Sequence, residues 1–227
     1  MKKSTFFSLW AVFLLIPATL IFGGKNYYLT GTLVILEAML PFFLRFEASR
    51  AQARQIVLIA LMAALAAISR TVFAFLPHFK PITAIIMLSG IAFGAQAGFL
   101  TGALAAFASN FAFGQGLWTP WQMFAYGFGG FLAGLLFHDR HFLQKKFAPL
   151  GLSIFGFVMI LLFVGPLLDC SSLFLFGGKL TWAYVISIFS VGLWANLLHG
   201  ISCAVTLMLL GKPLLQKLLR LRQKYGI

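Results

Sequence analysis

The stretch with the most chemically distinctive side chains is residues 114–123, which holds two Trp, two Gln, a Thr and a Pro. Aromatic faces stack on planar rings, and amides donate and accept hydrogen bonds, so this mixture suits a neutral, planar or bulky organic ligand. An interfacial belt, in which Trp lies at the depth of lipid headgroups regardless of any ligand, is the alternative. The candidate substrate-binding residues here are Gln115, Trp118, Thr119, Trp121 and Gln122.

The short loop 77–81 begins and ends with proline, which restricts its backbone. It therefore presents His78, Phe79 and Lys80 from a stiff support, and we take all three as candidate ligand contacts. A solvated loop charge explains Lys80 equally well. Two further candidates, Trp182 and Tyr184, stand at the start of the last apolar run. They could cover a ligand there, or they could simply anchor the run in an aromatic belt.

Several ionisable or polar residues interrupt the apolar runs. Arg70 and Glu37 each need a partner or water, because an unpaired charge within a membrane costs roughly 2.5–3.5 kcal/mol or more. The two could pair, or each could face the interior separately. Asn110, Asn196 and His199 are expected to hydrogen-bond between helices or to line a cavity.

No set of residues supports an enzyme. The best candidates are the pair Asp169 and Cys170 and the cluster 138–141, but a metal site needs three or four convergent ligands, and this cluster lies in a basic segment. With four acidic residues and no nucleotide or nucleophile motif, the chain is not expected to hydrolyse ATP. We expect no catalytic residue, no metal and no intrinsic cofactor.

The composition places these residues in a membrane. Hydrophobic residues make up 61% of the 227, charged residues 9%, and the mean hydropathy is +0.98. A spanning helix needs about 20 apolar residues, so about eight spans fit. Apolar runs predict an all-α polytopic protein with helices at 5–23, 27–46, 53–76, 82–95, 97–113, 121–138, 149–168 and 183–211. The fourth and fifth runs are separated only by residues 94–98 and form either a tight hairpin or one interrupted segment.

Basic residues are concentrated on one of the two sides of this arrangement. Thirteen of the 17 Lys and Arg fall on one side, which identifies it as cytoplasmic and places both termini there. The net charge of +13 therefore reports orientation, and no nucleic-acid partner is expected. The basic segment 212–227 carries regularly spaced Leu and is expected to lie along the inner membrane surface.

Small residues recur at four-residue spacing in the third run, at Ala60, Ala63, Ala64 and Ala67. Such strips let another helix approach closely. The spacing does not tell whether that helix belongs to this chain or to a partner.

Together, the run 60–70, the loop 77–81 and the stretch 114–123 resemble the substrate-binding S components of energy-coupling-factor (ECF) importers, over about residues 50–211. The resemblance implies a six-helix core, 51–211, after an N-terminal helical hairpin, 1–50, that the common pattern lacks. It also implies that the four alanines contact a transmembrane scaffold (T) subunit coupled to two cytoplasmic ATPases, in the cell membrane of a prokaryote.

Within that superfamily, the loop 77–81 and the stretch 114–123 look most like the group associated with cobalamin. The resemblance therefore implies capture of a vitamin, with cobalamin as the expected transported ligand. A queuosine-type base or another micronutrient stays open as the substrate. A stand-alone secondary transporter is the competing class, and Glu37 is the carboxylate placed for its ion site.

Overall fold

The computed structural model describes residues 27–49, 52–138, 147–175 and 181–226. Within these ranges the chain forms helices joined by short connections and contains no strand. The predicted all-α class is therefore confirmed. The first predicted helix, 5–23, lies outside the described ranges.

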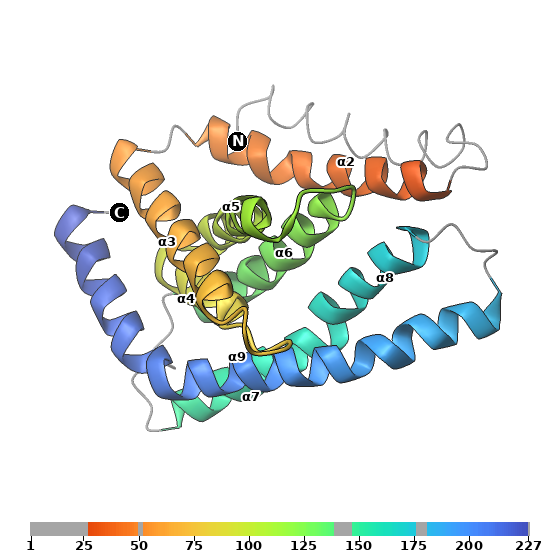
Figure 1. Ribbon diagram of the computed structural model, residues 1–227. Helices are drawn as coiled ribbons and strands as arrows, with labels where there is room; N and C mark the ends of the chain where they lie inside the picture. The colour runs from red at the N-terminus through yellow and green to blue at the C-terminus, as the bar shows by residue number, and fades with distance from the viewer. Residues whose placement is uncertain (1–26, 50–51, 139–146, 176–180, 227) are drawn as a thin grey trace.

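The helices are labelled in Figure 1. They are α2 (Tyr27–Ala48), α3 (Ala53–Val72), α4 (Ile82–Phe93), α5 (Ala95–Phe113), α6 (Thr119–Phe137), α7 (Ala148–Met159), the π-helix η2 (Ile160–Val164), α8 (Gly165–Leu175) and α9 (Trp182–Tyr225). Four described segments are long and apolar enough to cross a membrane, at Leu29–Ala48, Ala53–Val72, Ala148–Leu173 and Trp182–Tyr225. α2 runs along one side of the bundle and α9 along the other, with α4, α5 and α6 between them (Figure 1).

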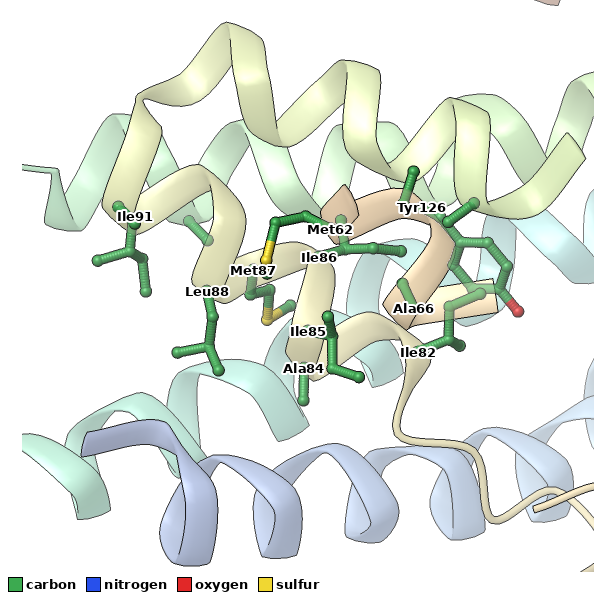
Figure 2. Close-up of a cluster of buried hydrophobic side chains, with 14 of the residues drawn as sticks. Met62, Ala66, Ile82, Ala84, Ile85, Ile86, Met87, Leu88, Ile91 and Tyr126 are labelled. Carbon is green, nitrogen blue, oxygen red and sulfur yellow. The ribbon is translucent and has the colours of Figure 1, made fainter. Parts of the chain in front are cut away.

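The centre of the bundle is α4, a short helix whose 12 residues are all buried. A helix that is apolar all round has no face for solvent and must be enclosed. Figure 2 shows its isoleucine, methionine and leucine side chains with Met62 and Ala66 of α3 and Tyr126 of α6 around them. This enclosed helix fixes the positions of α3, α6 and α9, on which the candidate site depends.

The α4–α5 connection is a tight reversal at one residue, Gly94, rather than a single interrupted helix. Its φ of 98° lies in the region that favours glycine. Beside the turn, glycines allow close approach of backbones: a Cβ on Gly98 would overlap the carbonyl oxygen of Gly130 on α6. α5 and α6 consequently form the most extensive helix pair in the described chain.

The seventh predicted helix is longer than expected. We predicted a loop from Asp169 onward, and this is wrong: the helix continues through the π-helical turn η2 and α8 to Leu175. Asp169 lies inside this helix, where Asn196 of α9 donates a hydrogen bond to its carboxyl group.

The last helix runs through most of the predicted tail and ends at Tyr225. It bends in its C-terminal part (Figure 1), as expected where Pro213 interrupts the helical hydrogen bonds. Beyond the proline, Leu215 and Leu218 are buried in the main core cluster. Part of the apolar face of this segment therefore packs against the rest of the protein, whereas we expected the segment to lie along the membrane surface.

Candidate substrate-binding cavity

A cavity of about 340 Å³ opens near the C-terminal end of α3, on the side predicted to be external. The loop 77–81, the start of α6, α8 and the middle of α9 form its walls. Its lining consists of His78, Lys80, Trp118, Gln122, Tyr126, Leu168, Asp169, Ser171, Ser172, Ala195, Asn196 and His199. A larger cavity, about 720 Å³, lies at the opposite end of α3 and contains none of the predicted site residues.

Four predicted site residues meet in the smaller cavity, although they come from segments about 40 residues apart. They are His78 and Lys80 from the loop and Trp118 and Gln122 from the start of α6. The loop reaches the cavity through a local backbone distortion, since His78 has a φ of 58°, which is rare for a non-glycine residue. Their role in binding remains a prediction.

Three other predicted residues of the 114–123 stretch do not line the cavity. Gln115 donates from Nε2 to the carbonyl oxygen of Phe107 at 2.9 Å. Thr119 is buried and hydrogen-bonded to its neighbours. Trp121 turns to α2, where its Nε1 donates to Thr32 Oγ1 at 3.4 Å. These residues hold the start of α6 in place.

The remaining predicted contacts also lie away from the cavity lining. The Phe79 ring packs 5.8 Å from that of Phe73 at the end of α3. Trp182 is 83% exposed at the start of α9. Tyr184 donates from its hydroxyl to the carbonyl oxygen of Leu173 at 3.2 Å and so ties α9 to the end of α8.

Two cations flank one aromatic ring beside the cavity. The Arg70 guanidinium carbon lies 4.5 Å, and the Lys80 ammonium 4.8 Å, from the centre of the Phe113 ring. Arg70 is 6% exposed and donates from Nη1 to Ser109 Oγ at 2.6 Å and to Asn110 Oδ1 at 2.8 Å. Partial burial, and secondarily Arg70, lower the pKa of Lys80. Among the described residues, the contacts of Arg70 thus lie on α5, and Glu37 of α2 is not one of them.

Asn196 and His199, expected either to bond between helices or to line a cavity, do both. Asn196 Nδ2 lies 2.8 Å from Asp169 Oδ2, and His199 Nε2 lies 3.0 Å from Thr83 Oγ1. We did not predict that Tyr126, Ser171, Ser172 or Asp169 would line the cavity. A carboxylate within an apolar run was the available signal for Asp169, because such residues usually serve a function.

The small-residue strip on α3 divides between two environments. Ala63 and Ala67 are buried and face the inside of the bundle, whereas Ala60 and Ala64 are exposed. The exposed pair lies among large apolar side chains that are also exposed, including Val57, Leu61 and Ile68. Only Ala60 and Ala64 are therefore available to a partner without a rearrangement of the bundle.

Comparison with known families decides the class of protein. The model of the family described as ECF-type riboflavin transporter, S component, matches residues 50–217. The chain belongs to this family. No curated protein and no solved structure matched the chain.

The match confirms the predicted S component and its role as a transport subunit rather than an enzyme. It extends from the start of α3 into the C-terminal part of α9 and leaves α2 outside. Membership implies a T subunit and ATPases as partners. The cobalamin-associated group is not supported, since the matched family is described by riboflavin.

Proposed function

We propose that this S component captures riboflavin, or a flavin of similar size, in the external cavity between the loop 77–81, α6, α8 and α9. An ATP-driven complex with a T subunit and two ATPases then imports it. The single observation that carries this proposal is the family match over residues 50–217. The size and lining of the cavity agree with it.

Cavity volume bears on the choice between riboflavin and cobalamin. At about 340 Å³, the cavity lies at the small end of the range of roughly 300–1,000 Å³ for sites that enclose drug-sized ligands. A flavin is a three-ring heterocycle with a five-carbon polyol chain and falls within this class. A corrinoid is several times larger. Volume therefore favours the flavin and replaces our expectation of cobalamin.

The lining offers both kinds of contact that a flavin requires. The indole of Trp118 supplies an aromatic face for the planar ring. Lys80 and Gln122 bring polar groups near it, and Ser172 and Asp169 bring hydroxyl and carboxyl oxygens from α8. Hydroxyl groups of a polyol chain could pair with these oxygens, since buried polar groups of a ligand need partners.

For the partner surface, we propose the exposed face of α3 around Ala60 and Ala64 as the contact with the T subunit. Helices approach closely where small residues leave room, and close approach strengthens dispersion contacts in a membrane. This surface lies outside the cavity lining. Capture of the ligand and contact with the scaffold thus involve different residues.

Titration of the purified chain in detergent tests the proposed ligand. Riboflavin should bind with a measurable heat and quenched flavin fluorescence, whereas cobalamin should not bind. Trp118→Ala should weaken riboflavin binding by about 1–3 kcal/mol through lost stacking. Trp182→Ala is the matched control, because Trp182 is exposed and outside the cavity lining. Absence of riboflavin binding by the wild type would reject the proposed substrate.

A further inference from the structure

We infer that Arg70 acts as a positioning residue that fixes the amide of Gln122, so that the cavity presents a hydrogen-bond donor and selects planar ligands carrying a carbonyl or ring-nitrogen acceptor. Arg70 is not part of the cavity lining, whereas Gln122 is. The inference rests on the proposed function for the identity of the ligand. It deepens that proposal by assigning specificity to a hydrogen-bond chain.

The series of hydrogen bonds starts at the guanidinium of Arg70, a group that can only donate. A guanidinium has five N–H groups and no acceptor. Arg70 Nη1 contacts Ser109 Oγ and Asn110 Oδ1 at 2.6 and 2.8 Å, which uses both of its protons. Amide oxygen and nitrogen have similar shapes, so their partners decide the orientation of the group. Arg70 therefore holds the oxygen of Asn110 toward itself.

The orientation of the Asn110 amide in turn fixes the orientation of the Gln122 amide. With its oxygen on Arg70, Asn110 must point its NH₂ group away, and Nδ2 lies 2.7 Å from Gln122 Oε1 and 3.0 Å from Thr119 Oγ1. Both protons of Nδ2 are thereby used. The oxygen of Gln122 must accept, which leaves its Nε2 as the free end of the amide.

Neighbouring hydrogen bonds agree with the same direction. Thr119 Oγ1 accepts from Asn110 and from the backbone N–H of Gly116 at 3.2 Å. Its own proton therefore goes to Gln115 Oε1 at 3.0 Å, and Gln115 Nε2 donates to the carbonyl oxygen of Phe107. Reversal of Asn110 or Gln115 would place two donors or two acceptors face to face.

Gln122 lines the cavity, and we take its Nε2 as the end of the amide that faces it. Within the described residues the structure gives Nε2 no hydrogen-bond partner, and Gln122 lines the cavity together with Lys80, which is also a donor. A ligand that offers an acceptor to this wall gains a hydrogen bond, whereas a ligand that offers a donor leaves two N–H groups opposed. The flavin ring carries two carbonyls and ring nitrogens and meets this requirement.

Two substitutions should change the group that residue 122 presents to the cavity from a hydrogen-bond donor to an acceptor. In Asn110→Asp, both carboxylate oxygens accept, so Arg70 remains paired while Gln122 must rotate to donate, which turns its oxygen to the cavity. Gln122→Glu places an acceptor there directly. Ser109→Asp is the matched control, since it adds the same charge beside Arg70 and leaves Asn110 and Gln122 unchanged. Arg70→Lys keeps a donor and should preserve the polarity.

A measurement without ligand tests the orientation. In protein labelled with ¹⁵N-glutamine, hydrogen exchange of the Gln122 amide should be fast in the wild type, because Nε2 has no protein partner. Gln122→Glu identifies the resonance by its loss. Exchange should slow by about tenfold or more in Asn110→Asp, where one N–H binds the carboxylate, and should stay fast in Ser109→Asp. Unchanged exchange in Asn110→Asp would overturn the inference.

Binding preference tests the consequence for specificity. Riboflavin is compared with 2-thioriboflavin, 4-thioriboflavin and 5-deazariboflavin, each of which weakens or removes one acceptor. The wild type, Ser109→Asp and Arg70→Lys should disfavour at least one analogue by about tenfold. Asn110→Asp and Gln122→Glu should both lose that preference.

A preference ratio in Asn110→Asp equal to that of the wild type, or a loss of preference in Ser109→Asp as large as in Asn110→Asp, would overturn the inference. If riboflavin fails to bind the wild type while amide exchange behaves as expected, the proposed substrate is rejected and the orientation of Gln122 is supported. The two proposals therefore fail in distinguishable ways.

Discussion

Asn196 of α9 donates a hydrogen bond from Nδ2 to Oδ2 of Asp169 on α8, at a distance of 2.8 Å. Both residues line the cavity. Two glycines make room for the pair: a Cβ on Gly165 would overlap the amide of Asn196, and a Cβ on Gly192 would overlap the carboxyl group of Asp169. The contact between α8 and α9 therefore shapes one wall of the cavity.

Gly192→Ala should disturb that wall. The added methyl group would displace the Asp169 carboxyl group, and we expect riboflavin binding to weaken by about tenfold. Gly211→Ala, also on α9, is the control, because the nearest atom to a Cβ there is Leu207 Cβ at 3.9 Å. Calorimetric titration of both variants measures the difference, and equal affinities would show that the carboxyl position does not matter.

The strip on α3 should separate into two functional pairs. Replacing the exposed Ala60 and Ala64 by Leu should abolish cellular uptake and spare riboflavin binding, because the added bulk blocks close approach of a partner helix. Replacing the buried Ala63 and Ala67 by Leu should instead destabilise the bundle by roughly 1–3 kcal/mol each through overpacking.

Uptake, ligand affinity and thermal unfolding of the purified variants together measure this separation. If Ala60→Leu and Ala64→Leu leave uptake intact, the exposed face of α3 is not the partner contact. If they lose ligand binding instead, the strip serves packing within this chain.

Orientation in the membrane is tested by labelling intact cells with an impermeant maleimide, after replacement of Cys170 and Cys203 by Ala. The basic-residue asymmetry predicts that Trp182→Cys reacts from outside and that Ser49→Cys does not. Both positions are exposed in the structure. The reverse pattern of labelling would show that the topology is inverted and that the cavity opens to the cytoplasm.

Much of the helical pattern could be predicted from sequence, because long apolar runs bounded by glycine, proline or charge coincide with α2 to α6 within a few residues at most ends. The position at which α8 ends could not be predicted from the sequence. A lone acid commonly marks the end of a span, whereas Asp169 stays helical because a partner distant in sequence, Asn196, supplies a hydrogen bond.

The site shows the same division. Trp118 and Trp121 are three residues apart, and the sequence alone predicted both as ligand contacts. In the structure, Trp118 lines the cavity, whereas Trp121 donates a hydrogen bond to Thr32 of α2. Composition does not determine the rotation of a helix about its axis, which depends on packing against α2 and α5. The volume of the cavity is likewise a property of packed helices and not of residue types.

Purification of the intact complex tests most directly the proposal that this chain is the flavin-binding subunit of an ATP-driven importer. The chain is expressed with an affinity tag in its native host and extracted from the membrane in mild detergent. The purified sample is then analysed by mass spectrometry for both proteins and small molecules. We predict a T subunit, two ATPases and bound riboflavin in one complex. Isolation of the chain without ATPases, or of a complex that retains a corrinoid and no flavin, would contradict the account.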